Sequence, residues 1–336
     1  MGTAAGLDGM QAIVFTGAGG PEVMELREVP APVLGAGEVR VRVRATAVNR
    51  ADLLQRMGSY PAPPDAPQDI PGLEFAGEVI EVGRGVIDWA PGARVFGLTG
   101  GGTYAEQVVV SARTLAPIPE KLGWVEAAAI PEAFVTAYDA MVVQGGLTAG
   151  DEVLVHAVGS GVGTAAIQIA RAIGARAIGT ARTQDKLARA EALGMSRGVL
   201  AADGDFAMAV LAASEGRGAD VVLELVGGKY VAEDLRCVAA GGRIILVGLM
   251  AGHTATLDLA TILRRRIRIQ GTVLRSRPLE EKIAAGQILA RRLAPLFTAG
   301  KLAPVVDWVV PLSQAAEAHR YVAGNQGFGK VVLEVP

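Results

Sequence analysis

Apolar and polar residues follow two patterns along the chain, and the first third shows one of them. Apolar residues there alternate with polar ones or run with β-branched residues, which predicts strands at Gln11 to Phe15, Glu38 to Val48 and Glu74 to Val82. Arg50 to Arg56, between the last two strands, has the spacing of a short helix. We therefore expect a β-rich region preceded by a flexible extension, Met1 to Gly9.

From about Trp124 the second pattern begins, in which helical segments alternate with short apolar strands. After a helix over Val125 to Gln144, the predicted strands are Glu152 to Ala157, Ala175 to Thr180, Val221 to Val226, Arg243 to Leu249 and Arg268 to Thr272. The helices between them are predicted at Gly161 to Ile173, Lys186 to Leu193, Tyr230 to Val238 and Leu259 to Arg265. Such alternation predicts a parallel sheet covered by helices on both faces.

The end of the chain returns to the first pattern. A helix predicted over Leu279 to Phe297 is followed by short strands, including Gly329 to Val335. The α/β part is therefore expected to be inserted into a β-rich domain, with residues 127–270 forming the insertion and residues 1–126 and 271–336 the other domain. A length of 336 residues fits two domains.

Composition narrows the possible partners. The formal net charge of −2 argues against a nucleic-acid surface, so the basic run from Arg264 to Arg268 is interpreted as a solvated helix end. No run of about 18 apolar residues predicts a membrane span, and no secretory signal is visible. Cys237, the single cysteine, has the surroundings of a buried structural thiol. These features predict a cytoplasmic protein without a disulfide.

A glycine-rich turn joins the first strand and helix of the α/β part. Strand Glu152 to Ala157 runs into Val158 and then into Gly159, Ser160, Gly161, Val162 and Gly163, where the helix begins. Glycines allow a tight turn and a close backbone approach, and a helix N-terminus offers free N–H groups to a pyrophosphate. The spacing is tighter than the usual G-x-G-x-x-G, but its position between strand and helix predicts a dinucleotide site.

The next strand indicates which nicotinamide cofactor binds. An NAD site presents an acidic residue at the end of this strand, whereas this chain continues from Thr180 into Arg182 and Thr183. If Thr183 is the N-cap, Lys186 occupies the third helical position, where a cation is unfavourable unless an anion joins it. The 2′-phosphate of NADPH would be that anion. The alternative is that Arg182 and Lys186 are ordinary solvent-facing charges.

Metal-ligating residues are scarce. Besides Cys237 the chain holds three histidines, His156, His253 and His319, in separate segments. Zinc in dehydrogenases needs thiolate or imidazole ligands, and these residues do not form an ordinary zinc site. We therefore expect no metal.

Several motifs together resemble one family over Met10 to Pro336. They are Gly19-Gly20-Pro21-Glu22, Asn49-Arg50-Ala51-Asp52, Pro71-Gly72-Leu73-Glu74, Ala128-Ala129-Ile130-Pro131-Glu132, Gly161-Val162-Gly163-Thr164-Ala165-Ala166-Ile167-Gln168, Gly248-Leu249-Met250, Leu274-Arg275-Ser276-Arg277 and Gly329-Lys330-Val331-Val332-Leu333. With them the chain resembles the medium-chain dehydrogenase/reductase superfamily, in its zinc-independent, zeta-crystallin-like quinone oxidoreductase branch. The resemblance implies a GroES-like domain with an inserted Rossmann domain, and an active site in the cleft between them.

Residue roles follow from the resemblance. Asn49 stands where zinc enzymes have a ligand cysteine, and Leu73 where they have a histidine. The resemblance implies that Asn49, Asp52 and Tyr60 line the substrate pocket. Expected cofactor contacts, besides the glycine-rich turn and Thr180 to Lys186, are Thr136, Val226, Gly227, Gly248, Leu249, Met250, Phe328 and Lys330. From the residues alone, Asn49 could instead be a helix cap and Tyr60 a half-buried loop aromatic.

The predicted activity is hydride transfer from NADPH to a quinone. A quinone is electrophilic and its reduced oxygens are phenol-like, so positioning and modest hydrogen bonding are sufficient. The alternatives are reduction of enone or alkenal double bonds, and a cofactor-binding structural or RNA-associated protein. Strands Arg243 to Leu249 and Arg268 to Thr272 come late in the sheet order, and Ile267, Ile269, Val273 and Leu274 would make its edge apolar. This predicts a homodimer through that edge.

Overall fold

The computed structural model describes residues 9–336, so the expected extension lies outside the described residues except for Gly9, which begins the first strand. The described chain divides into two compact units. The first comprises residues up to Glu132 together with 275–299 and 304–336, and the second comprises residues 133–274 and 300–303. Residues 300–303 belong to the second unit although the segments on either side belong to the first, and nothing in the sequence predicts this.

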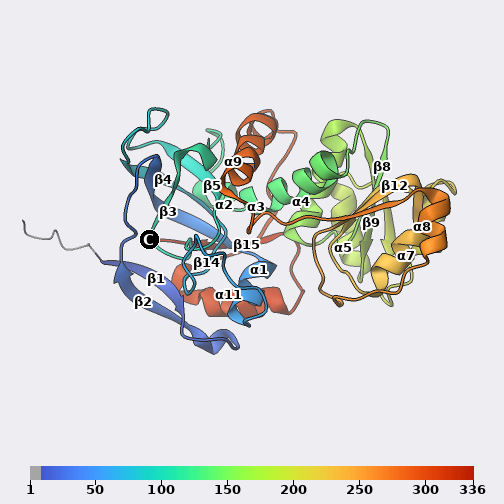
Figure 1. The fold of residues 1–336 in the computed structure, drawn as a ribbon, viewed down its shortest axis with the longest axis horizontal. Coiled ribbons are helices and arrows are strands. Elements are labelled where there is room, and N and C mark those ends of the chain that lie inside the picture. The colour runs from blue at the N-terminus through green and yellow to red at the C-terminus, as the bar shows by residue number, and fades with distance from the viewer. Residues whose placement is uncertain (1–8) are drawn as a thin grey trace, which may run out of the picture. The chain divides into compact units, whose positions relative to one another are not determined.

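The first unit is built mainly from strands (Figure 1). These are β1 (Gly9–Phe15), β2 (Met24–Pro30), β3 (Glu38–Val48), β4 (Glu74–Val82), β5 (Arg94–Leu98), β6 (Gln107–Ser111), β7 (Leu115–Pro117), β14 (Val306–Pro311) and β15 (Lys330–Glu334). Its helices are α1 (Arg50–Arg56), α2 (Trp124–Ala128), α9 (Leu279–Ile288), α10 (Ala294–Thr298) and α11 (Ala315–Ala323). The strands predicted for this region are therefore confirmed.

Strand β3 organises the larger sheet of the first unit. The sheet has the order β14-β15-β3-β4-β5-β7, with β6 paired to the same strand β3, while β1 and β2 form a separate pair. β15, from the end of the chain, pairs antiparallel with β3, with Val331 opposite Val48. The inward residues of these strands, such as Val41, Val43 and Leu333, are completely buried in one core. The two ends of the chain thus build a single sheet.

The second unit contains one six-stranded sheet of the order β10-β9-β8-β11-β12-β13, and all of its strands are parallel. Its strands are β8 (Glu152–Val155), β9 (Arg176–Ala181), β10 (Arg197–Leu200), β11 (Ala219–Glu224), β12 (Val238–Leu246) and β13 (Arg268–Gly271). The helices are α4 (Gly161–Ile173), α5 (Gln184–Ala192), α6 (Ala207–Ala213), α7 (Lys229–Cys237) and α8 (Leu259–Arg265). The strand order reverses between β8 and β11, where such sheets bind ligands.

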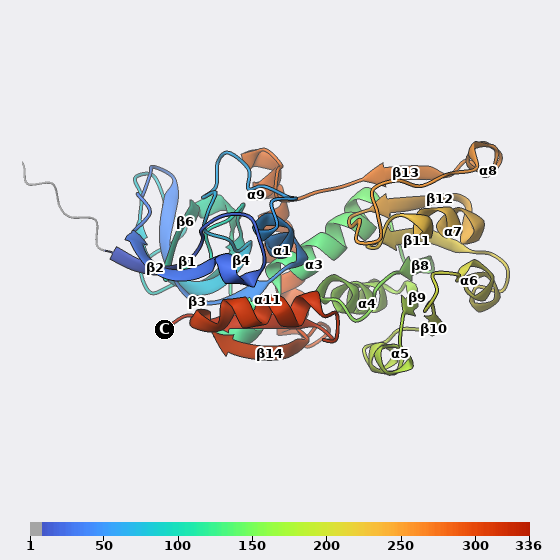
Figure 2. The same ribbon diagram turned by 90° about the horizontal axis from the view of Figure 1, so that it is seen from below.

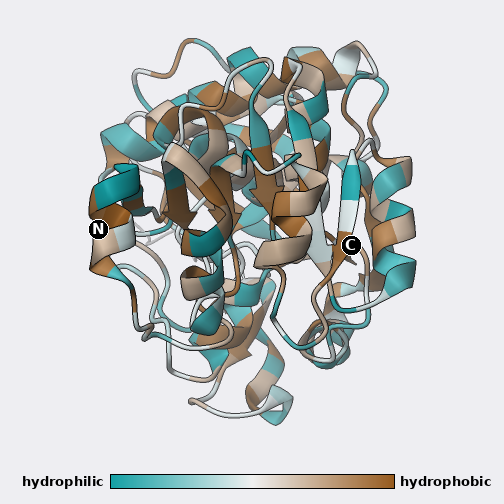
Figure 3. Cartoon of the chain, turned by 90° about the vertical axis from the view of Figure 1, so that its right-hand side faces the viewer, coloured by the Kyte–Doolittle hydropathy of each residue, from teal (hydrophilic) through white to brown (hydrophobic). Residues whose placement is uncertain are grey.

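Helices lie on both sides of this sheet (Figure 2). Figure 3 shows apolar strands in the interior behind helices with hydrophilic outer segments. Buried side chains of the sheet, among them Leu154, Val222 and Ile244, pack in one core with residues of α6 and α7, including Cys237. Cys237 is completely buried, as predicted, and this burial raises the pKa of its thiol.

Two predicted long helices are interrupted in the structure. The segment Val125 to Gln144 forms α2, then α3 (Pro131–Tyr138), and then a π-helical segment, Asp139–Gln144. Pro131 has no N–H to continue a helix but fits the first position of a new one. The segment Leu279 to Phe297 likewise passes from α9 through the π-helical Leu289–Leu293 to α10. Among the described residues, no helix combines the length and apolar character that crossing a bilayer requires.

Candidate active site and cofactor-binding residues

The glycine-rich turn after β8 has the geometry expected of a phosphate-binding loop. Ser160 is the N-cap of α4, and its hydroxyl accepts the N–H of Gly163 over 3.0 Å. A Cβ on Gly163 would lie 2.4 Å from the carbonyl oxygen of Ala157, so the helix start approaches the loop as closely as only glycine permits. Ala157 itself has a left-handed backbone with φ of 49°. The start of α4 therefore packs closely against the preceding turn.

Loops from two neighbouring strands lie beside each other at the same edge of the sheet. The N–H of Ala251 donates to the carbonyl of Val226 over 2.7 Å, and Gly228 donates to Gly252 over 3.1 Å. Gly227 lies so close to Leu249 that a Cβ would meet its Cα at 2.9 Å. Val226, Gly227, Gly248, Leu249 and Met250, all expected to contact the cofactor, thus belong to one loop pair. Leu249 and Met250 are exposed.

The end of β9 supplies the residues predicted to select the cofactor. Thr183 occupies the N-cap of α5, as expected, although its hydroxyl forms no capping hydrogen bond. Lys186 is then the third residue of the helix, and Arg182 is exposed. Thr180 is buried, and its hydroxyl lies 2.8 Å from Nδ1 of His156. Thr180 therefore reaches into the unit, whereas Arg182 faces solvent.

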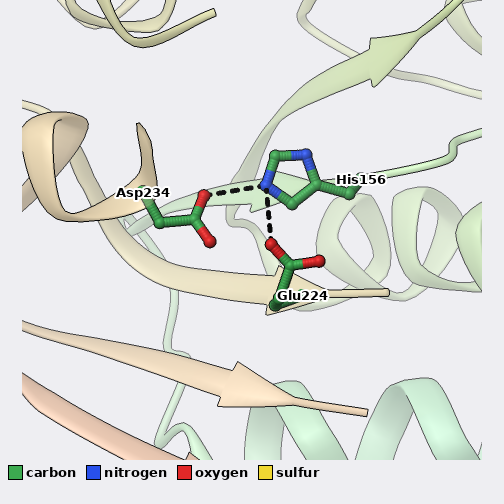
Figure 4. A group of neighbouring side chains, drawn as sticks. All are labelled: His156, Glu224 and Asp234. Carbon is green, nitrogen blue, oxygen red and sulfur yellow. Dashed lines mark hydrogen bonds and ion pairs between the residues drawn. The ribbon is translucent and has the colours of Figure 1, made fainter. Parts of the chain in front are cut away.

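His156, Glu224 and Asp234 form a buried cluster, in which both carboxyl groups lie close to the imidazole ring (Figure 4). His156 Nε2 is 2.8 Å from an oxygen of Asp234 and 3.7 Å from one of Glu224. The other oxygen of Glu224 accepts the N–H groups of Val226 and Gly227. The cluster thus links the end of β8, the end of β11 and helix α7 to a loop expected to contact the cofactor.

Burial controls the charges of this cluster. It raises the pKa of Glu224 to about 8 and that of Asp234 to about 7, and it lowers the pKa of His156. No Lys or Arg within residues 9–336 pairs with either carboxyl, and each has one buried oxygen without a hydrogen bond. Such a group remains in the interior by keeping protons on its carboxyls.

The same three side chains are the described group whose geometry could hold a metal ion, with ligand atoms within 4.8 Å of one another. This grouping was missed in the sequence, because its members come from three elements separated by up to 78 residues. The 2.8 Å contact between His156 and Asp234 has the length of an ordinary hydrogen bond.

In the first unit, Asn49 lies in a buried ion cluster. Its side chain accepts from Nζ of Lys330 over 2.6 Å and donates to Glu74 over 2.8 Å. Lys330 also pairs with the same carboxyl oxygen of Glu74 at 2.7 Å. Asn49 does occupy the N-cap of α1, but its amide is used by Lys330, Glu74 and the carbonyl of Ala47. Its side chain is therefore not simply a helix cap.

Asp52 forms hydrogen bonds with the backbone of Asn49 and of Gly72. It is completely buried, and its carboxyl accepts the N–H groups of Asn49 and Gly72 at 2.8 and 3.2 Å. The hydroxyl of Tyr104 lies 3.3 Å from it and bridges to His319. Burial raises the pKa of Asp52 to about 6. With no exposed surface, Asp52 is placed to position Asn49 rather than to line a pocket.

Tyr60 is held through its backbone and ring, which leaves its hydroxyl available. Arg275 donates to the carbonyl of Tyr60 over 3.2 Å, and its guanidinium lies 5.3 Å from the centre of the Tyr60 ring. Arg275 also binds Gln55 and the carbonyl of Gly100. The Tyr60 hydroxyl has no hydrogen-bond partner among the described side chains, and the residue is half-buried.

The structure groups the expected site residues differently from the sequence prediction. Lys330, expected to contact the cofactor, joins Asn49 in the first unit, where Phe328 is also buried. Thr136 is buried in α3. Glu74, Glu132 and Arg275 were missed as site residues, although they stood in recognised motifs. For Glu74 and Glu132 the available signal was a charged residue inside an apolar run, whereas Arg275, followed by Ser276 and Arg277, carried no such signal.

Comparisons with known proteins agree with this architecture. Residues 35–120 match the alcohol dehydrogenase GroES-like domain, and residues 161–289 match the zinc-binding dehydrogenase domain. The quinone oxidoreductase of Sus scrofa is 33% identical over 96% of this chain and 97% of its own length. A crystal structure described as an NAD-dependent alcohol dehydrogenase has a TM-score of 0.87 and 39% identity, covering 97% of this chain and 100% of that one.

Some relatives are much longer than this chain. The spectinabilin polyketide synthase system protein NorB of Streptomyces orinoci is 37% identical over 95% of this chain, which spans only 14% of that protein. The chain spans 5% and 8% of two further Streptomyces polyketide synthases. It therefore corresponds to one segment of each.

A GroES-like domain that holds an inserted, doubly wound parallel sheet defines the medium-chain dehydrogenase/reductase class, which confirms the predicted fold. Within that class, the chain belongs to the quinone oxidoreductase family. A member of that family, the quinone oxidoreductase of Sus scrofa, is named as an oxidoreductase.

Proposed function

We propose that this protein reduces quinones with NADPH and needs no metal. The observation that carries the proposal is the Asn49 amide, which Glu74 and Lys330 hold in a fixed orientation. Such an arrangement can position a substrate at a rigid, preorganised surface, but it supplies no Lewis acid. A quinone accepts hydride without one, because its reduced form is stabilised as a phenol-like oxygen.

The donor atoms around Asn49 do not fit zinc, although the matched family model is named for it. Leu73 is buried and has no ligand atom, and the carboxyl of Glu74 is already paired with the ammonium of Lys330. In the described part of this unit, the imidazole of His319 contacts Tyr104 and Arg56. Zinc prefers thiolate and imidazole, and a neighbouring ammonium would repel it.

The residues of the second unit fit a dinucleotide. The turn from Gly159 to Gly163 and the start of α4 would hold the pyrophosphate, since unpartnered N–H groups at a helix N-terminus attract anions. Arg182 and Lys186 would hold a 2′-phosphate, because no acidic residue stands at the end of β9. When bound, the nicotinamide supplies the hydride.

Steady-state turnover with a panel of substrates tests the proposal. NADPH oxidation should be fast with benzoquinones and naphthoquinones, and dialysis against a strong chelator should not change it. Elemental analysis should find no stoichiometric zinc in active protein. The proposal fails if quinones are not reduced, or if removal of a stoichiometric metal abolishes turnover.

We also propose a cytoplasmic homodimer paired through β13. This strand ends the sheet; Leu259 and Leu263 of the preceding helix α8 are exposed, and so is Val273, which follows the strand. An unpaired edge with apolar neighbours favours pairing with a second copy. Light scattering should give a dimer at micromolar concentration, and Ile269→Pro should give a monomer because proline cannot donate to a ladder. A wild-type monomer, or a dimer that survives the substitution, would exclude this interface.

A further inference from the structure

Glu132 differs from the other acidic residues near Asn49. It is the second residue of α3, and its backbone N–H donates to Glu74 over 2.8 Å. Asp52 and Glu74 are completely buried and their carboxyls are hydrogen-bonded. The carboxyl of Glu132 forms no hydrogen bond within residues 9–336, and the residue remains partly exposed. Glu132 is therefore the acid of this group that is able to reach a bound molecule.

The charges around Glu132 balance without it. Asp52 of α1 and Glu74 of β4 are negative, while Lys330 of β15 and Arg275, in the segment after β13, are positive. An ionised Glu132 would add one uncompensated negative charge to a largely desolvated group. Burial, followed by repulsion from Glu74, raises the pKa of Glu132 to about 8. At neutral pH this carboxyl mostly carries a proton.

We propose that Glu132 is a catalytic proton donor, used for substrates such as conjugated enones and alkenals whose reduction leaves a carbanion. The proposal rests on the proposed hydride transfer from a nicotinamide cofactor. Thr136, which is expected to contact that cofactor, lies four residues further along α3, so both side chains leave the helix on the same side.

The step balances in atoms and electrons. A hydride from the reduced nicotinamide forms a C–H bond at the β-carbon, and the electron pair of the C=C bond moves to the α-carbon and the carbonyl. The O–H bond of Glu132 breaks as its proton forms the second C–H bond at the α-carbon. The nicotinamide is oxidised, the C=C bond is reduced, and solvent reprotonates the carboxylate of Glu132.

Quinones depend much less on this acid. Hydride transfer to a quinone leaves a phenolate-like oxygen, which can take its proton from water. An enolate is far more basic and gains more from a positioned acid, and general acid catalysis contributes about 100- to 10,000-fold. Glu132 should therefore matter for one substrate class far more than for the other. The Tyr60 hydroxyl, whose pKa burial raises, is the competing donor.

Glu132→Gln, Glu132→Asp and the exposed Glu126→Gln as a matched control test the proposal with one enone and one quinone. Glu132→Gln should lower kcat for the enone about 100-fold or more and kcat for the quinone less than about tenfold. Glu132→Asp should restore part of the enone activity, and Glu126→Gln should behave as wild type. An equal loss on both substrates would assign Glu132 a structural role, and a larger selective loss in Tyr60→Phe would assign the proton to Tyr60.

Two further measurements can be made even if Glu132→Gln does not fold. Enone turnover by the wild type should fall as pH rises through about 8, since the donor must be protonated. Infrared difference spectra should show a protonated carboxyl that titrates over the same range and is altered in Glu132→Asp. A carboxyl ionised throughout neutral pH would overturn the proposal. Quinone reduction without any enone reduction would also overturn it while the proposed function stands, whereas failure with both substrates would refute the proposed function itself.

Discussion

The two units each bury a group of acidic side chains, but they compensate the charge differently. In the first unit, Glu74 forms an ion pair with Lys330 at 2.7 Å, and Arg275 lies near Asp52. In the second unit, Glu224 and Asp234 have His156 and no ion-paired Lys or Arg among the described residues.

The difference determines what each group can do. In the Asn49 cluster, Lys330 and Arg275 offset the charges of Glu74 and Asp52, and the partly exposed Glu132 is the acid left to exchange a proton with a bound molecule. The His156 cluster adjusts its charge with protons, and because Glu224 binds the N–H groups of Val226 and Gly227, the adjustment acts on a loop. The paired cations of the first unit therefore accompany its proposed chemistry, whereas the cluster of the second unit, which has no paired cation among the described residues, supports a loop.

The largest effect should come from removing the fixed cation. Lys330→Met leaves the Glu74 carboxylate buried and unpaired, which should lower the free energy of unfolding by about 3–5 kcal/mol in urea titrations. Lys330→Met combined with Glu74→Gln should recover much of the loss, and the exposed Lys301→Met should change little. A loss below about 1 kcal/mol would show that the first unit does not depend on this ion pair.

A smaller effect is expected on NADPH affinity when the predicted cofactor contacts of the second unit are removed. Replacing Arg182 and Lys186 with Ala should weaken NADPH binding about 10- to 100-fold and leave NADH binding nearly unchanged, because a charge-assisted contact contributes about 1.5–3 kcal/mol. Calorimetry measures both affinities directly. Equal wild-type affinities for the two cofactors would remove the basis for NADPH selection.

The smallest effect should appear in the pH dependence of stability. Glu224 has a folded-state pKa raised to about 8, so the folded protein holds a proton that the unfolded chain releases at lower pH. Wild-type stability should therefore decline as pH rises through the range up to about 8. Glu224→Gln removes this titration.

The difference in unfolding free energy between Glu224→Gln and wild type should accordingly shift in favour of the variant by about 1–2 kcal/mol between pH 7 and 9. The exposed Glu191→Gln serves as the control and should follow wild type. Parallel pH profiles for Glu224→Gln and wild type would mean that the cluster does not titrate in this range.

The fold could be predicted because its signals are local. Strand β3 and helices α1 and α8 were predicted with the observed bounds, since each has a periodic pattern between clear breaks. The short elements β10 and α6 were missed because neither shows a distinct period: β10 has only two apolar residues, Val199 and Leu200, and every residue of α6 is apolar. The single helix predicted over Val125 to Gln144 was wrong because Pro131 is a helix-start residue that divides it.

The site was only partly predictable because its contacts are distant in sequence. Lys330 and Asn49 are 281 residues apart, and no spacing rule links them. The family resemblance indicated Asn49 and Tyr60 but gave no sign that Asp52 would be inaccessible or that Glu132 would hold a proton. Those properties arise from burial and neighbouring charges, which exist only once the sheet has brought β4, β15 and α3 together.

Gly163 has a practical consequence for protein engineering. A single added methyl group there would collide with the carbonyl of Ala157, and backbone atoms of Val158 leave it no space to move. Laboratory evolution toward another cofactor should therefore retain this glycine in every surviving clone, whereas Arg182 and Lys186 at the surface accept wide variation. A saturation library at positions 182 and 186 should therefore change cofactor preference while most variants still fold. In a saturation library at position 163, almost all variants should misfold.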